Sequence, residues 1–211
     1  MENASKALII AGSVLIAILV ISLLVVFYNN IKEFQNANHQ VDISEQISEF
    51  NKQYDVYYRD NLYGSDILSI ANKVVDYNIR ESDEEGYSKL ETSVKFKTGL
   101  SPNGEKLIDS KKAYNAQELN KVSQDLEKKV SDLGREKYSG KTISALSGMR
   151  DNQLEDLVGS EKLQEVKAKN KSYLQYKSAL TELKSKTFRA IEFKYDKGTA
   201  RISLMQFEET K

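Results

Sequence analysis

An uncharged apolar run near the amino terminus constrains this chain more than any other feature. Residues 7–27 read ALIIAGSVLIAILVISLLVVF, which is 21 consecutive residues without a charged side chain. An α-helix of that length rises about 30 Å, the thickness of the hydrocarbon core of a bilayer. The run is longer than the core of a cleaved signal peptide and is followed by bulky side chains, so it predicts an uncleaved membrane anchor. A buried helix of a soluble protein is the alternative interpretation.

The predicted span and its flanks also indicate an orientation. Lys6 and the terminal amine precede the span, whereas the residues that follow it are acidic on balance. The flank with more positive charge usually stays in the cytoplasm, so we expect a cytoplasmic amino terminus and residues 28–211 on the outside. The residues expected within the bilayer include Ala7, Leu8, Ile9, Ile10, Leu15, Leu19, Leu23 and Phe27.

The composition excludes or disfavours several classes of function. The chain has no cysteine, which rules out disulfides, thiolate metal sites and cysteine nucleophiles. Its single histidine, His39, is a weak metal ligand alone, and its serines lack a histidine that could activate them. Basic and acidic side chains number 31 each, without the basic excess of nucleic-acid-binding proteins. We therefore expect no enzymatic activity, cofactor, metal or nucleic-acid partner, and no small-molecule substrate is evident.

One short segment resembles a phosphate-binding loop without meeting its requirements. Residues 134–142 read GREKYSGKT, with five residues between the two glycines where the phosphate-binding loop needs four. The residues around this segment have the charged pattern of exposed helices, and no buried strand precedes it. We interpret the match as coincidental.

Apolar residues at spacings of three and four continue the anchor as an amphipathic helix to about residue 60. Packing against neighbouring subunits of a filament would explain this stripe, and so would packing against the chain's own sheet. A second helix is predicted over residues 66–77, with Ser65 or Asp66 as its N-cap. The stripe of the first helix consists of Ile31, Phe34, Val41, Ile47, Phe50, Tyr54 and Tyr57.

Alternation with a period of two predicts strands in two distant regions. Residues 93–97 form one strand, and residues 188–195 and 200–207 flank a short Gly-containing loop that is typical of a hairpin. The predicted fold class is therefore α+β, with a transmembrane helix, its amphipathic continuation, a small antiparallel sheet with a C-terminal hairpin, and a helical insertion. Ile191, Phe193 and Tyr195 should share one face of the first hairpin strand, and Ile202, Leu204 and Gln206 one face of its partner.

The stretch between the strands, residues 105–187, has a helical pattern with two short apolar stripes. A coiled-coil surface for a partner protein or an intramolecular bundle explains these stripes, and their shortness favours the bundle. The stripes consist of Leu119, Val122, Leu126, Val130 and Leu133, and of Val166, Tyr173, Tyr176, Leu180 and Leu183. The chain then divides into residues 1–27 (tail and anchor), 28–104 (juxtamembrane helix, second helix and first strand), 105–187 (helical insertion) and 188–211 (hairpin).

An N-terminal anchor, an amphipathic helix and a C-terminal sheet together resemble the layout of type IV pilins and pseudopilins. The segments MENASKALI at residues 1–9, EFNKQY at 49–54 and YGSDILSIANKVVDYN at 63–78 are similar to a group of uncharacterised single-span surface proteins of low-GC Gram-positive bacteria. This resemblance implies a membrane anchor and carries no activity with it. A prepilin cut after Gly12 would place Ala17 where pilins have a glutamate, so the resemblance is one of layout.

These features predict a membrane-anchored, extracytoplasmic structural protein, a pilin-like subunit or accessory component of a surface filament or secretion assembly. The expected partners are the lipid bilayer and other membrane or surface proteins, including further copies of this chain. The residues expected at subunit contacts include Gly12, Ser13 and Ala17, because small residues let helices approach closely. Ile31 and Phe34 are expected there too, because these bulky apolar residues lie too near the bilayer for the chain's own sheet to cover them easily.

The alternative function is a monomeric membrane-tethered binding module that presents residues 105–187 to a partner protein or to the cell wall. A group of tyrosines could contribute by stacking on sugar rings, although such residues more often form the edge of a core. These tyrosines are Tyr54, Tyr57, Tyr58 and Tyr63.

Overall fold

The computed structural model describes residues 2–80, 89–102 and 106–210, except for the side chains of residues 2–5, 7–9, 11 and 34–42. The chain comprises two compact units, Met1–Phe50 and Asn51–Lys211, which are described separately below.

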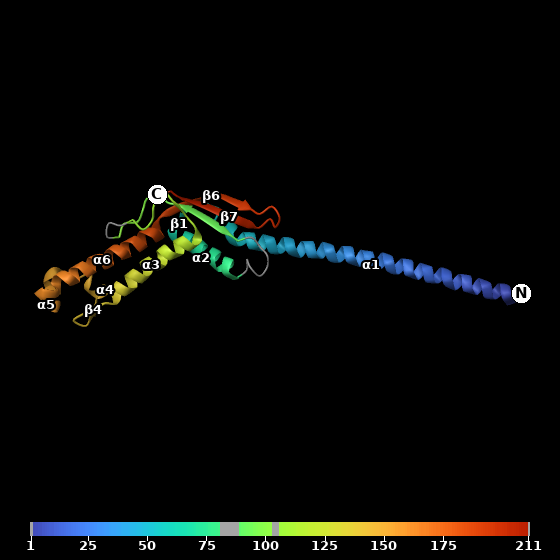
Figure 1. Ribbon diagram of the computed structural model, residues 1–211, viewed down its shortest axis with the longest axis horizontal. Coiled ribbons are helices and arrows are strands. Elements are labelled where there is room, and N and C mark those ends of the chain that lie inside the picture. Colours follow the sequence, from blue (N-terminus) through green and yellow to red (C-terminus); the bar gives the residue numbers. More distant parts are fainter. Residues whose placement is uncertain (1, 81–88, 103–105, 211) are drawn as a thin grey trace. The chain divides into compact units, whose positions relative to one another are not determined.

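A single helix makes up the first unit. α1 spans Glu2–Asp55 without a break, so the predicted anchor and its continuation belong to one element whose last turn enters the second unit (Figure 1). Along the predicted apolar stripe, Ile31 is exposed and Phe50 is buried. The predictions for Phe34 and Val41 concern side chains outside the described part of the chain.

A five-stranded sheet forms the centre of the second unit. Its strands are β1 (Leu62–Tyr63), β2 (Glu91–Lys95), β3 (Ala113–Tyr114), β6 (Thr187–Tyr195) and β7 (Ile202–Glu209), in the order β1-β6-β7-β2-β3. The hairpin β6–β7 is antiparallel, but β2 pairs with β7 in parallel, with Val94 opposite Phe207. The prediction of an antiparallel sheet is therefore wrong, because alternation with a period of two is the same in parallel and antiparallel strands.

Two irregularities in the hairpin change which side chains face the core. The ladder passes from Ala190 to Glu192 on β6, which leaves Ile191 as an extra residue that is 48% exposed. On β7 the ladder likewise skips Ser203. An extra residue in one strand moves all later side chains to the opposite face. The prediction that Ile202, Leu204 and Gln206 share one face is therefore wrong, because Leu204 and Gln206 lie on the face opposite to Ile202. The buried residues of β7 are Ile202, Met205, Phe207 and Glu209.

Helix α2 (Gly64–Arg80) joins the sheet to the other long helices. It begins two residues before the predicted start, and Asp66 lies in its first turn, where Oδ2 accepts a hydrogen bond from the Tyr63 backbone at 2.9 Å. α2 contacts the sheet at β1, β2 and β6, and it also contacts α3 (Ala116–Arg135) and α6 (Ser160–Ser185). Its buried residues are Gly64, Ile67, Leu68, Ile70, Ala71, Val74 and Tyr77.

Helices α3 and α6 lie side by side and continue beyond the sheet to a second, smaller core (Figure 1). Between them come β4 (Lys137–Tyr138), β5 (Lys141–Thr142), α4 (Ile143–Leu146) and α5 (Asp151–Val158). The apolar stripes of this region are thus largely buried within the chain, as the bundle interpretation requires. The buried residues of the second core are Ile143, Leu146, Leu154, Val166 and Tyr173.

A buried ion pair closes the end of the sheet. Lys186 lies between α6 and β6, and its Nζ is 2.8 Å from Oε1 of Glu209, whose side chain is fully buried. The other carboxylate oxygen, Oε2, accepts hydrogen bonds from the backbone of Lys97 at 2.6 Å and of Thr98 at 3.1 Å. The Thr98 hydroxyl also donates to Oε1 at 2.9 Å. The Glu209 carboxylate therefore joins β7 to the segment after β2 and to the end of α6.

Candidate functional site

The apolar part of α1 is the first candidate for a functional surface. The stretch Gly12–Glu33 is long and apolar enough to cross a membrane, and none of it is buried. Each large apolar side chain described from Val14 to Ile31 is between 51% and 67% exposed. The length and composition of Gly12–Glu33 are those of a membrane anchor or a signal sequence.

The residues predicted at subunit contacts only partly share one face of α1. Ser13 and Ile31 are separated by five turns of about 3.6 residues, so they lie on the same face, and Ala17 is one turn beyond Ser13. Gly12 points about a quarter of a turn away from them. The Ser13 hydroxyl donates to the Ile10 carbonyl at 2.8 Å. The side chain of Phe34 lies outside the described part of the chain.

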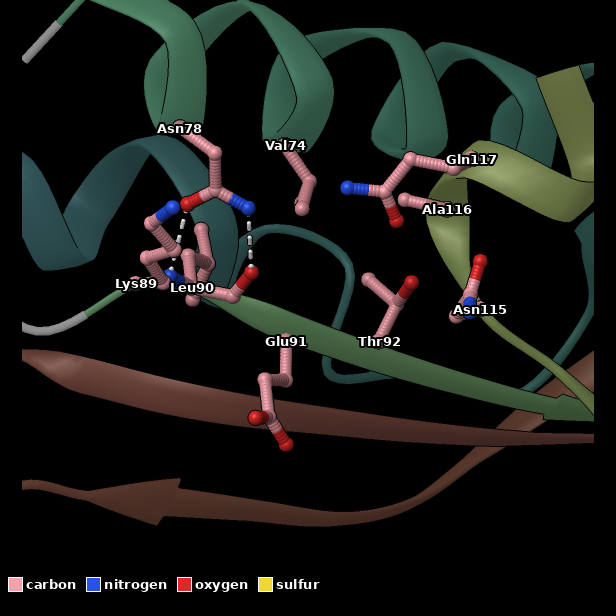
Figure 2. Close-up of a pocket in the computed structure, with 9 residues that line it drawn as sticks. All are labelled: Val74, Asn78, Lys89, Leu90, Glu91, Thr92, Asn115, Ala116 and Gln117. Carbon is pink, nitrogen blue, oxygen red and sulfur yellow. Dashed lines mark hydrogen bonds between the residues drawn. The ribbon is translucent and has the colours of Figure 1, made fainter. Parts of the chain in front are cut away.

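A cleft of about 350 Å³ lies between β2, the end of α2 and the start of α3, which are three separate segments of the sequence. Figure 2 shows α2 above the cleft, β2 below it and the first turn of α3 at one side. None of its residues was predicted to form a site. The lining residues are Val74, Asn78, Lys89, Leu90, Glu91, Thr92, Asn115, Ala116 and Gln117.

One wall of the cleft is fixed by an amide that bridges a helix to a strand. Asn78 donates its Nδ2 to the Leu90 carbonyl at 2.8 Å, and its Oδ1 accepts a hydrogen bond from the Leu90 backbone at 2.8 Å. Both bonds are visible in Figure 2. This pair of bonds holds the residue before β2 at a set distance from the last turn of α2.

A capping box fixes the opposite wall. Asn115 Oδ1 accepts a hydrogen bond from the Glu118 backbone at 2.9 Å, and Glu118 Oε2 accepts one from the Asn115 backbone at 3.1 Å. Lys112 Nζ lies 2.7 Å from Glu118 Oε1. The hydrogen bond from Lys112, with that from the Asn115 backbone, lowers the pKa of the Glu118 carboxyl. The Asn-x-x-Glu spacing was the one sequence signal that could have located this helix start.

Thr92 supplies the unusual feature of the cleft. Its side chain is 6% exposed, and the described residues offer no hydrogen-bond partner to its hydroxyl. Buried polar groups in folded proteins are nearly always paired, so an unpaired hydroxyl on a cavity wall suggests a missing partner. No sequence pattern distinguishes Thr92 from a threonine in an ordinary strand.

No family model, curated protein or solved structure matches this chain. Functional assignment therefore depends on the exposed apolar helix and on the geometry of the second unit.

The predicted tyrosine group is divided by the structure. Tyr54 is buried, while Tyr58 and Tyr63 are exposed on the surface. Tyr58 packs edge-on against Phe193 at 5.0 Å between ring centroids, and Lys73 Nζ donates to the Tyr57 hydroxyl at 3.2 Å. The four tyrosines therefore do not form a single stacking platform.

The segment that resembles a phosphate-binding loop has another structural role. Gly134 is buried near the end of α3, where a Cβ atom would lie 3.0 Å from the Tyr173 ring. Residues 137–142 form the β4–β5 hairpin, which is not the strand–loop–helix arrangement that binds phosphate. The interpretation of this match as coincidental agrees with the structure.

Proposed function

We propose that this chain is a membrane-anchored structural protein, a subunit or accessory component of a surface filament or secretion assembly. In this proposal α1 spans the bilayer, residues 28–211 lie outside, and the chain acts through contacts with other proteins. The observation that carries the proposal is the exposure of the apolar side chains described over Gly12–Glu33, which need lipid or another helix to cover them.

Contacts between copies would use the face of α1 that contains Ser13, Ala17 and Ile31. Ser13 and Ala17 are small, so neighbouring helices can approach closely inside the membrane. Ile31 lies on the same face and is 55% exposed near the end of the apolar stretch. Together these residues form one seam along the helix.

Cysteine cross-linking tests this seam. The chain contains no cysteine, so Ser13→Cys introduces a single thiol. We expect disulfide-linked dimers when membranes of cells that express this variant are treated with a mild oxidant such as copper phenanthroline. Adding Ile31→Glu should reduce the cross-linked fraction at least fivefold, because a charge in the seam opposes close packing. Asn30→Glu is the matched control, since it introduces the same charge about a quarter of a turn away and should leave cross-linking unchanged. Absence of dimers in the Ser13→Cys parent would contradict self-association.

Protease accessibility tests the orientation. Trypsin added to intact, wall-stripped cells should degrade residues 28–211 and leave an anchor fragment, because the flank with positive charge precedes the span. Detection by a tag at the amino terminus should show that fragment only after protease treatment. Full protection of the chain in intact cells, with digestion after lysis, would show the opposite orientation.

A second candidate function is a monomeric, membrane-tethered binding module that presents its helical region to a partner. A groove of about 490 Å³ beside α5 and α6 favours it. Leu174 in this groove is 47% exposed, and the amide oxygen of Asn170 is buried without a partner among the described residues. Monomeric behaviour in the cross-linking experiment would make this module the preferred function.

A further inference from the structure

We propose that the cleft between β2, α2 and α3 is a binding site for a ligand with a carboxylate group. The site is a property of the second unit alone. It therefore does not depend on whether the chain forms an assembly or acts as a monomer.

The first turn of α3 supplies hydrogen-bond donors to the cleft. The backbone N–H groups of Ala116 and Gln117 have no acceptor within the helix, as in the first turn of any helix. The next N–H group, that of Glu118, is already bound to Asn115 Oδ1 at 2.9 Å. α3 has 20 residues, so its N-terminus carries the partial positive charge that attracts anions.

Thr92 provides an independent indication that a ligand belongs there. Figure 2 shows its side chain directed from β2 toward the side chain of Gln117, across the open part of the cleft. The hydroxyl is buried and has no partner among the described residues. An acceptor atom placed between Thr92 and the first turn of α3 would satisfy the hydroxyl and the free N–H groups together.

The donors around the cleft suit a carboxylate better than a phosphate dianion. Glu118 follows Gln117 directly, and its charge is already matched by Lys112 at 2.7 Å. Figure 2 shows the Glu91 side chain directed away from the cleft, below β2. A singly charged, planar carboxylate suits two backbone donors and a hydroxyl, whereas a phosphate dianion brings a second negative charge that these three donors do not match. Val74 and Leu90 provide apolar wall for a short stem.

A carboxylate can come from two sources, which share this chemistry. One is a free small organic acid, and the other is the C-terminal carboxylate of a peptide, which proteins bind through backbone N–H groups at helix ends. With a volume of about 350 Å³, the cleft has room for the carboxylate and a small residue or two.

Nuclear magnetic resonance titration of the full-length chain in detergent micelles tests the proposal. The probes are acetate, N-acetyl-Ala-Ala, its C-terminal amide and inorganic phosphate, and the signals followed are the backbone amides of Ala116 and Gln117. We expect saturable shifts with N-acetyl-Ala-Ala and none with the amide. Equal binding of acetate would identify a free acid as the source, and binding of the peptide alone would identify a chain terminus.

A pair of variants separates binding from folding. Thr92→Val removes the hydroxyl with little change of shape and should reduce the affinity for N-acetyl-Ala-Ala at least tenfold. Thermal stability should stay equal or rise, because the hydroxyl has no hydrogen-bond partner among the described residues to lose. Ser93→Ala removes the neighbouring hydroxyl on the other face of β2 and should leave affinity unchanged. Tighter binding of phosphate, no saturable shift with any probe, or unchanged affinity in Thr92→Val would each overturn the proposal; the second result would mean that the cleft holds water only.

Discussion

Replacing Glu209 with glutamine should reduce the free energy of unfolding by about 3 kcal/mol, because it removes one charge from a buried pair and leaves the other without its main partner. Lys186 would retain the Thr98 hydroxyl at 2.5 Å and, among the carboxylates of the described residues, Glu182 at 3.5 Å on the exposed side of α6. This loss is a large fraction of the 5–15 kcal/mol that stabilises an ordinary domain. Urea unfolding followed by tyrosine circular dichroism measures it, since the chain has 12 tyrosines and no tryptophan.

The neighbouring glutamate provides a matched control for this substitution. Glu208 pairs with Arg189 at 3.0 Å, and both side chains are partly exposed. Exposed pairs contribute about 0–1 kcal/mol, so Glu208→Gln should have a small effect. Equal losses in the two variants would show that burial of the Glu209 pair does not increase its contribution.

The stability of the wild-type chain and that of Glu209→Gln should depend differently on pH. Burial raises the pKa of Glu209, but hydrogen bonds from Lys186, Thr98 and Lys97 outweigh burial and lower it below the ordinary value. The pKa of Glu209 is lower in the folded state than in the unfolded chain, where it is about 4.3. The ionised carboxylate therefore contributes its full stabilisation above about pH 4.3, and this stabilisation is lost as the pH falls through the pKa of the folded state. The wild-type chain should therefore lose more stability between pH 5 and pH 2 than Glu209→Gln does, and parallel pH curves would contradict this assignment.

Gly64→Ala should be the second most damaging change, at about 3 kcal/mol, the upper end of the usual cost of overpacking. A Cβ atom at this position would lie 1.8 Å from the Leu183 carbonyl oxygen, which belongs to backbone and cannot move aside cheaply. The Gly64 backbone also donates to the Lys186 carbonyl at 2.7 Å. The substitution would thus separate the start of α2 from the end of α6, and thermal unfolding measures the loss.

Gly148→Ala is the corresponding control. No atom lies within 4 Å of a Cβ atom at Gly148, and its backbone is not in the left-handed region. Replacing a glycine of this kind with alanine usually stabilises a protein by about 0.4–1 kcal/mol, because alanine reduces the conformational entropy of the unfolded chain. The two glycine variants should therefore shift the unfolding temperature in opposite directions, and a shift of the same size and sign in both would rule out the contact with Leu183 as the cause.

Local patterns in the sequence predicted individual elements well. The apolar run predicted the exposed part of α1, and period-two alternation located β6 and β7 to within two residues of their bounds. The two-residue strands β1 and β3 were missed because so short a strand shows no periodicity. The bulges at Ile191 and Ser203 were missed because they depend on the pairing of two strands.

Relations between distant segments could not be predicted. The parallel pairing of β2 with β7, and the packing of α2 against α3 and α6, depend on how the chain folds back on itself. The residues around the cleft in Figure 2 come from three separate segments, α2, β2 and α3, so they form no motif in the sequence. The missing partner of Thr92 is likewise visible only in three dimensions.

The order of strands in the sheet has a consequence for synthesis of the chain. Strands β6 and β7 lie between β1 and β2 in the sheet, yet they come from residues 187–209, so they are synthesised after all the other strands. Until residues 187–209 emerge, β1 and β2 have no strand to connect them, and the nascent chain exposes unpaired strand edges. Such edges are targets for aggregation and proteolysis. A chain that stops before residue 187 would therefore lack the two strands that join β1 to β2, and quality control should remove it.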